Sequence, residues 1–464
     1  MIELVRLFKL IGFMNILLVI VDTLRYDALG VNGKSKSTPH LDKFAHGKSF
    51  TKCFSAAPWT LPSCASILTG FYPSNHHLMQ HWFRLDKEPI SSILQRQGFY
   101  TAAITNNSNF AYNIGYQNYF SEYHFYPDGN NKIHDDELNH DAPFTKALEI
   151  LKKHKNNLFL LLHTNIVHDY YLEVNKRYYE QFTNKKVKSK TWELKDRGFF
   201  LIKNQREKDL QAVKLRYDAG VYYMDQQLHK VLSNINPNTL VVIVGDHGEG
   251  FNPKLFRIHH GGRMHNDLLH VPLILSFPGK TKDIDYHKLV STVDIVPTIL
   301  DYLKVGTARD FDGQSIFKNK KRIIIYSEEY RSFYLKNSFT RIDEKSGRVF
   351  GKKAWISLKG KVIGNILDNL RYYERFDLEK DFTENKELPV NEADKVNLTD
   401  ISVNQPFNLV NLQEKQHNLE NKLNYLQTQI KNMSEKISEL EPQIGKIIKR
   451  LSPKWWVKRI LHKS

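Results

Sequence analysis

Three polar side chains that could hold a cation directly follow apolar runs of the sequence. Asp22 ends the string NILLVIVD, and Asp246 and His247 follow the apolar run in VVIVGDHGEGF. Two carboxylates and an imidazole are suitable ligands for one divalent cation. A carboxylate after an apolar run can also be a helix N-cap or a loop residue, and for a single Asp that is the simpler interpretation. The consecutive Asp and His residues favour a cation site.

A hydroxyl group that could act as a nucleophile occurs in the string SAAPWTLPSCASILTG. Thr60 stands there between two prolines, just before an expected helix over residues 62–69. The free backbone N–H groups and the dipole at a helix N-terminus favour an anion. Beside a cation, Thr60 would be placed to lose its proton and attack an ester. The alternative is that Thr60 only caps the helix.

Buried strands must position these side chains. Continuous apolar runs rich in Ile, Leu and Val are typical of strands buried on both faces. They cover residues 15–21, 100–105, 158–163, 239–245 and 271–276. Helices are expected between them at 90–97, 144–153 and 206–233. The alternation predicts a mostly parallel sheet, in which ligands bind at the carboxyl ends of the strands. Asp22, His163 and Asp246 all stand at such ends.

Several motifs and their order resemble sulfatases and their relatives in the alkaline-phosphatase superfamily. Besides the strand before Asp22 and the Gly-Asp-His-Gly element, the matching strings are ASILTGFYP, HVPLILSFPG, STVDIVPTILDYL, FDGQSI and ERFDLEKDFTENKEL. Several motifs in the family's order are far more specific than any one of them. The resemblance covers about residues 15–397. It implies an α/β/α sandwich with a mostly parallel central sheet and a smaller α+β subdomain at its C-terminal end.

The nucleophile position departs from the best-known sulfatases. Enzymes of the formylglycine type carry Cys or Ser followed by x-Pro-x-Arg, whereas this chain has Thr60-Leu61-Pro62-Ser63-Cys64. Threonine cannot become formylglycine. The chain instead resembles the relatives that use a Thr nucleophile and form phospho-threonine, among them phosphodiesterases and phosphoethanolamine transferases.

The resemblance to the Thr-type relatives also implies a ligand set. One divalent cation (Ca²⁺, Mg²⁺, Mn²⁺ or Zn²⁺) would be held by Asp22, Thr60, Asp246 and His247. The family's tandem Asp-Asp is reduced here to Asp22-Thr23. The missing carboxylates argue against a complete second metal site.

Further residues resemble the family's proton-transfer and substrate-binding positions. They are His163 and His168 in LFLLLHTNIVHDYY, His260 in FRIHHGGRMH, and Arg25. His168 or His260 would protonate the leaving group, although isolated histidines are usually structural. His163 and Arg25 are predicted to bind substrate. Arg25 would orient Asp22 or the nucleophile loop through a charge-assisted hydrogen bond, and a surface ion pair is the alternative.

The chain is expected to have four parts. They are a catalytic domain over 1–306, a smaller subdomain over 307–400, a coiled coil over 405–451 and a basic aromatic tail over 452–464. Apolar residues from Leu419 to Leu451 alternate spacings of four and three, which is typical of a coiled-coil seam. The coil predicts a homo-oligomer or a coiled-coil partner, and one amphipathic helix packed on the catalytic domain is the alternative. The tail, SPKWWVKRILHKS, fits peripheral membrane contact and a solvated end equally well.

Composition narrows the partners and the compartment. The formal net charge is +17, which favours acidic partners, but the lysines are spread out and there is no nucleic-acid-binding motif. The chain has only two cysteines, Cys53 and Cys64, so it has neither a disulfide framework nor a Cys-rich zinc site. The apolar run at 15–21 is too short to cross a membrane, and its removal as a signal peptide would take the strand before Asp22. A cytoplasmic protein, with membrane contact through the tail, is expected.

Three functions fit these observations. The first is a metal-dependent hydrolase or transferase that acts on phosphate or sulfate esters through a covalent intermediate on Thr60. The second is a sulfuric ester hydrolase that works without formylglycine. The third is a catalytically degenerate scaffold that works through its coiled coil.

Overall fold

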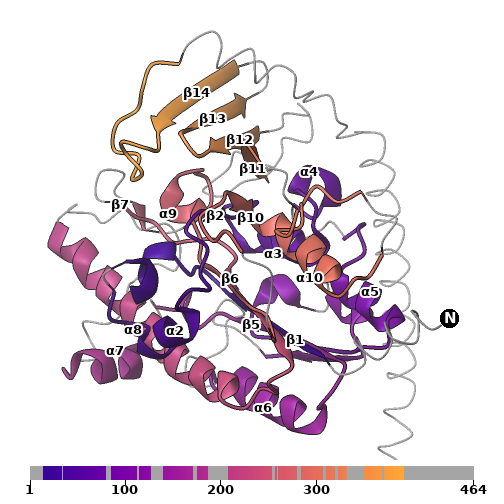
Figure 1. The fold of residues 1–464 in the computed structure, drawn as a ribbon. Coiled ribbons are helices and arrows are strands. Elements are labelled where there is room, and N and C mark those ends of the chain that lie inside the picture. The colour runs from indigo at the N-terminus through magenta and orange to yellow at the C-terminus, as the bar shows by residue number, and fades with distance from the viewer. Residues whose placement is uncertain are drawn as a thin grey trace, which may run out of the picture. The chain divides into compact units, whose positions relative to one another are not determined.

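A six-stranded sheet in the order β4-β3-β5-β1-β6-β9 forms the centre of the catalytic part (Figure 1). The computed structural model describes residues 14–33, 35–79, 85–111, 114–126, 139–170, 175–186, 207–252, 257–258, 260–279, 284–306, 310–318, 322–331, 350–367 and 370–390. The strands are β1 (Asn15–Val21), β3 (Tyr100–Thr105), β4 (Glu122–Phe125), β5 (Leu158–Thr164), β6 (Thr239–Gly245) and β9 (Leu273–Ser276). All five expected strands are therefore present.

The sheet is parallel except at one edge. β1 pairs in parallel with both β5 and β6, whereas β9 runs antiparallel to β6, with Leu273 opposite Val244. Between β6 and β9 the described residues form short elements, β7 (Phe251–Asn252), β8 (Arg257–Ile258) and α9 (Asn266–Leu269). The chain re-enters the sheet as β9 at the same edge where it left the sheet after β6. It therefore has no crossover of the kind that a parallel strand needs. The short strand β4 was not predicted because its residues Glu122–Phe125 are only half-buried and polar in part.

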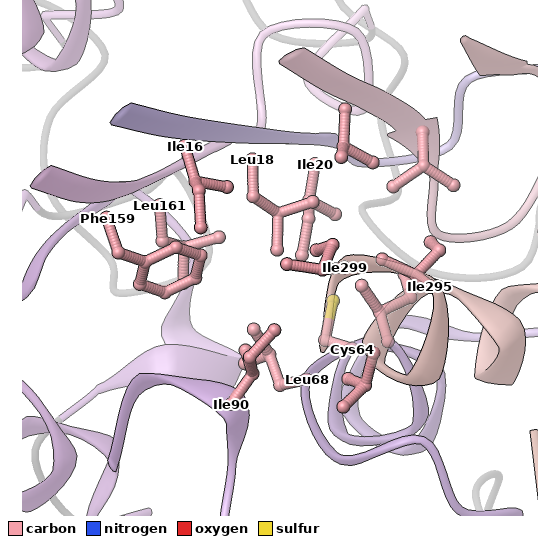
Figure 2. Packing of buried hydrophobic residues seen from close by; sticks show 14 of the residues in the cluster. Ile16, Leu18, Ile20, Cys64, Leu68, Ile90, Phe159, Leu161, Ile295 and Ile299 are labelled. Carbon is pink, nitrogen blue, oxygen red and sulfur yellow. The ribbon is translucent and has the colours of Figure 1, made fainter. Parts of the chain in front are cut away.

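Helices cover both faces of the sheet (Figure 1), as expected for an α/β/α sandwich. The side chains of β1 alternate between the two apolar cores. Ile16, Leu18 and Ile20 pack with α3 (Thr60–Thr69), α5 (Ile90–Arg96) and α10 (Ile295–Tyr302), as Figure 2 shows. Leu17, Val19 and Val21 face α2 (Pro39–Ala45), α6 (Ala142–Lys153), α7 (Asn175–Thr183) and α8 (Glu207–Leu232). Because both faces are buried, β1 is a rigid support for the residue that follows it.

The smaller subdomain is an antiparallel sheet in the order β11-β12-β13-β14. Its strands are β11 (Ile324–Arg331), β12 (Phe350–Ser357), β13 (Gly360–Leu367) and β14 (Leu370–Asp377). No helix occurs among the residues described between 310 and 390, so the expected α+β character is corrected to β. Its buried face (Ile325, Ala354, Ile356) packs on Met264 and Leu269 of the catalytic part. The sheet obtains its core from a neighbour and needs no helix of its own.

The chain divides into two compact units, Met1–Val396 and Asn397–Ser464. Both sheets belong to the first unit. The predicted coiled coil over 405–451 and the tail over 452–464 lie outside the described residues and stay predictions. Among the described helices, none has both the length and the apolar character needed to span a bilayer.

Candidate active site

Three expected metal ligands meet at the carboxyl edge of the central sheet. Asp22 follows β1, and Asp246 and His247 follow the adjacent strand β6. Each offers one ligand atom, these atoms lie within 4.8 Å of one another, and all three side chains are buried. The site therefore forms because neighbouring parallel strands end side by side.

Thr60 lies against this group. Its Oγ1 is 3.3 Å from Asp22 Oδ2 and 3.2 Å from His247 Nε2. The helix α3 begins at Thr60 itself, two residues earlier than expected. Its first turn is tied to the end of β6, because Ser63 Oγ donates to the Asp246 carbonyl oxygen at 2.5 Å. Helix and strand therefore hold the hydroxyl and the ligands in one fixed arrangement.

Hydrogen bonds set the orientation of His247 and Asp246. His247 Nδ1 donates to the Gly248 carbonyl oxygen at 2.8 Å, which leaves a lone pair on Nε2. That nitrogen is 3.5 Å from Asp22 Oδ1 and 3.5 Å from Asp246 Oδ2. Asp246 Oδ1 accepts the backbone N–H groups of Thr23 at 3.0 Å and His247 at 2.7 Å. Oδ2 of Asp246 therefore faces the site.

Asp22 carries an unsatisfied buried oxygen. Its Oδ2 accepts hydrogen bonds from Thr60 and from Asn107 Nδ2, the latter at 2.5 Å, but its Oδ1 has no hydrogen-bond donor. Burial raises the pKa of Asp22 to about 7, with the charge of His168 opposing this shift. Burial and the charge of Asp22 raise the pKa of Asp246 well above its ordinary value. Two buried carboxylates with an orphaned oxygen fit a divalent cation, which would supply the missing positive charge.

His168 and His260 also reach the site. The His260 ring centre is 4.5 Å from that of His247 and 5.3 Å from that of His168. Nδ1 of His260 lies 3.2 Å from Oε2 of the buried Glu249. The two histidines predicted to protonate the leaving group therefore lie together beside the metal ligands.

A buried chain of polar groups stands behind His168. Its Nδ1 lies 3.0 Å from Asp169 Oδ1, and Asp169 Oδ2 lies 3.0 Å from His140 Nε2. Burial alone would lower the pKa of His168, but the charges of Asp22, Asp169 and Glu249 outweigh it and raise the pKa to about 10. The raised pKa favours the protonated form of His168 at neutral pH, and its role as proton donor stays a prediction.

Sequence reasoning missed Asp169, His140, Asn107 and Glu249. Asp169 is adjacent to His168, and Asn107 follows β3 much as Asp22 follows β1. Polar residues just after every buried strand were therefore a usable signal. His140 and Glu249 gave no comparable signal. The position of His140 depends on hydrogen bonds to residues that are distant in the sequence.

Arg25 forms an ion pair with Asp27. Its Nε and Nη2 bind the Asp27 carboxylate at 2.7 and 2.8 Å, and its Nη1 donates to the Glu249 carbonyl oxygen at 2.6 Å. These contacts match the ion-pair alternative and tie Arg25 to the loop after β6. Its predicted roles in orienting Asp22 or the nucleophile loop and in binding substrate stay predictions.

His163 is enclosed in the core below the site. Its Nδ1 lies 3.3 Å from Thr105 Oγ1, its ring centre is 4.7 Å from that of Phe110, and its Nε2 is buried without a hydrogen-bond partner. Burial lowers the pKa of His163 to about 3. The side chain is neutral and has no solvent exposure. Its predicted contact with substrate stays a prediction.

Comparisons with known proteins agree with this geometry. The Sulfatase family model matches residues 14–305, which is more than half of the 464 residues. Over 78 residues the chain is 37% identical to the low-salt glycan biosynthesis sulfotransferase of Haloferax volcanii, covering 17% of this chain and 16% of that protein. Over 362 residues it is 24% identical to the ulvan-active sulfatase of Formosa agariphila, covering 65% and 64%. The chain therefore spans less than two thirds of the length of either relative.

The fold is shared with solved structures. The phosphonate monoester hydrolase of Agrobacterium radiobacter superposes with a TM-score of 0.62 at 16% sequence identity, over 87% of this chain and 96% of that one. At this identity the likeness concerns the fold alone.

Proposed function

The chain belongs to the sulfatase family of the alkaline-phosphatase superfamily, a family of hydrolases, and we propose that it cleaves phosphate or sulfate esters by attack of Thr60. The observation that carries the proposal is the position of Thr60 Oγ1, within 3.3 Å of both Asp22 and His247 at the first residue of α3. A buried hydroxyl beside metal ligands and a helix N-terminus suits nucleophilic attack on an anionic ester.

One divalent cation would be held by Asp22, Asp246, His247 and Thr60. When bound, it would supply positive charge to the ester oxygen and favour the alkoxide form of the nucleophile. The orphaned Oδ1 of Asp22, the lone pair of His247 Nε2 and the inward Oδ2 of Asp246 are the chain's own contributions. Oxygen and imidazole donors of this kind suit Ca²⁺, Mg²⁺, Mn²⁺ or Zn²⁺.

Two proton movements are needed, one from the Thr60 hydroxyl and one to the leaving group. Thr60 Oγ1 donates a hydrogen bond to Asp22 Oδ2, 3.3 Å away, and its proton would leave to solvent when the cation binds, so that Asp22 stays an ionised ligand. His168, held by Asp169 through Nδ1, is the donor for the leaving group, and His260 lies next to it. The bond from phosphorus or sulfur to the leaving oxygen breaks while a new bond forms to Thr60. Water or an acceptor alcohol then releases the covalent ester, so hydrolysis and transfer share the first step.

Phosphate esters are the first candidate substrates, because this Thr site resembles enzymes that form phospho-threonine. Sulfate esters are the second candidate class, because one curated relative is named a sulfatase and another a sulfotransferase. The transferred group on Thr60 distinguishes the two chemistries.

The test compares wild-type protein with Thr60→Ala and Thr60→Ser on phosphodiesters, phosphomonoesters and sulfate esters. Thr60→Ala is expected to lose turnover by on the order of 10⁴-fold or more, and Thr60→Ser to keep part of it. Metal content should stay near the wild-type value in both variants, because three ligands remain. Full activity of Thr60→Ala would overturn the nucleophile assignment. A folded wild-type protein with neither bound metal nor turnover would instead support the scaffold alternative.

A further inference from the structure

A second group of potential ligands also includes Asp246. Sulfur of Cys64, a ring nitrogen of His163 and a carboxylate oxygen of Asp246 lie within 4.8 Å of one another, and all three side chains are buried. We propose that these three residues form a second cation site, selective for a zinc-like ion, that shares Asp246 with the first site. The proposal rests on the proposed function only through this shared carboxylate.

The spacing of the three groups suits a small cation. Cys64 Sγ lies 3.8 Å from Asp246 Oδ2. Two ligands of a tetrahedral zinc ion, at about 2.3 Å for sulfur and about 2.0 Å for nitrogen or oxygen, are roughly 3.5 Å apart. The Cys64–Asp246 pair is already near this separation. The remaining pairs, within 4.8 Å, need to approach by about 1.5 Å at most, since nitrogen and oxygen ligands of one ion are roughly 3.3 Å apart.

His163 supplies the independent indication of a ligand. Thr105 Oγ1 lies 3.3 Å from its Nδ1, whereas its Nε2 is buried and has no hydrogen-bond partner. An unpartnered buried nitrogen costs about 1–3 kcal/mol, so native structures rarely keep one without a reason. A histidine whose Nδ1 is engaged by a second group is also the usual arrangement for a metal-bound Nε2.

The fold places Cys64 at this position firmly. It lies four residues after Thr60 on α3, one helical turn further along the same face. Figure 2 shows its side chain directed from α3 toward the sheet, among the buried residues of that core. Ser63 fastens the same turn of the helix to the Asp246 carbonyl oxygen. The thiol and the carboxylate are therefore held face to face by the backbone.

The two sites should prefer different cations. A thiolate with imidazole and carboxylate suits Zn²⁺ or Co²⁺, whereas Ca²⁺ and Mg²⁺ prefer oxygen ligands. Binding replaces the thiol proton of Cys64, which leaves to solvent. The protein is therefore expected to hold two ions when loaded with Zn²⁺ and one when loaded with Mg²⁺. The simpler interpretation is an S–H hydrogen bond to Asp246 beside an unmetallated His163, and it predicts one ion in both cases.

The experiment loads the full chain with Co²⁺ and records its near-ultraviolet and visible spectrum. A thiolate ligand gives a sulfur-to-cobalt charge-transfer band. The band is expected in wild-type protein and in Cys53→Ser, and it should be lost in Cys64→Ser. Cys53 is the matched control because it is the chain's other cysteine and is equally buried, in β2 (Cys53–Phe54). Metal content after Zn²⁺ loading should fall from two ions to one in Cys64→Ser and in His163→Phe.

The outcomes separate this proposal from the proposed function. Wild-type protein that binds one Co²⁺ without the charge-transfer band overturns the second site and leaves the first intact, even if every variant fails to fold. His247→Gln should lose the first ion and keep the band, since His247 is not a ligand of the second site. A band that persists in Cys64→Ser also overturns the assignment.

Discussion

The central sheet and the small antiparallel sheet differ in how they hold buried carboxylates. In and beside the small sheet, two buried acids are paired with lysine side chains. Lys361 Nζ lies 2.6 Å from Glu384 Oε1 with both side chains unexposed, and Lys353 Nζ lies 2.6 Å from Glu328 Oε1. Asn266 N–H also donates to Glu384 Oε2 at 2.6 Å. These charges are neutralised within the protein.

At the carboxyl edge of the central sheet the balance is different. Among the described residues, no Lys or Arg forms an ion pair with Asp22 or Asp246. The side chains near these two carboxylates include those of His247, Thr60 and Asn107. Isolated buried charges are costly. The comparison teaches that burial of a carboxylate does not by itself mark a site. At this edge the lack of a Lys or Arg partner coincides with the grouping of Asp22, Asp246 and His247, and that combination fits a cation site.

Asp246→Asn should have the largest effect, because it removes a charged ligand of the proposed cation site. Metal content is expected to fall and turnover to drop by on the order of 10⁴-fold. The apoprotein should not lose stability, since one of two repelling buried carboxylates is gone. Elemental analysis and steady-state rates measure the loss. Asp294→Asn is the matched control, because Asp294 pairs with Arg322 at 2.6 Å and should keep metal and turnover. Equal metal loss in both variants would contradict the comparison.

Lys361→Met should affect stability and leave the chemistry alone. It leaves Glu384 buried without its cation, which costs about 3–5 kcal/mol of unfolding free energy. Urea unfolding measures this loss, and the double variant Lys361→Met/Glu384→Leu should recover much of it. Metal content and the turnover number of the folded protein should be unchanged. A loss of metal in this variant would show that the two regions are not separate in function.

Asp169→Asn tests protonated His168 as the proton donor. The pKa of His168 is raised to about 10, so the donor is protonated at lower pH and is lost as pH rises through that value. Removing the charge of Asp169 lowers this pKa, and the alkaline loss of activity should begin at a lower pH. Turnover near neutrality should fall roughly 10- to 100-fold. The pH–rate profile is the measurement, and an unmoved alkaline limb would remove His168 as the proton donor.

Proton competition at Asp22 should give the smallest effect. Burial raises its pKa to about 7, and a protonated carboxyl is a poor ligand. Apparent metal affinity should therefore fall as pH drops below 7, by about tenfold per pH unit. Titration with a metal indicator at several pH values measures this. An affinity that does not change between pH 7 and about 5 would contradict Asp22 as a ligand.

Much of the scaffold could be predicted from the sequence because buried parallel strands leave an unambiguous apolar signal. The five runs and the helices between them were located to within a few residues, and strand order brought Asp22 and Asp246 together. The direction of β9 and the edge strand β4 were not predictable from apolar content. The first depends on the path of a loop, and the second is a half-buried edge.

Within the candidate site, the ligands were accessible to sequence reasoning and their supports were not. Asp22, Asp246, His247 and Thr60 stand at element ends. His140 reaches Asp169 from 29 positions away in the sequence, so only the folded chain shows the connection. Arg25 was singled out because its position resembles the family, and only the folded chain shows that its side chain contacts Asp27 and the loop after β6.

The most direct test of the central account is to trap the covalent intermediate on Thr60. Wild-type protein would be loaded with divalent metal, mixed with excess ester carrying a radiolabelled phosphorus or sulfur atom, and quenched in acid. Peptide mass spectrometry would then locate the label. The account predicts a labelled ester on Thr60 of the wild-type protein. In Thr60→Ser the label should be found on the serine at the same position. Turnover of the ester with the label on another side chain would contradict the account. So would an unlabelled Thr60 under conditions that trap the ester in the Thr60→Ser variant.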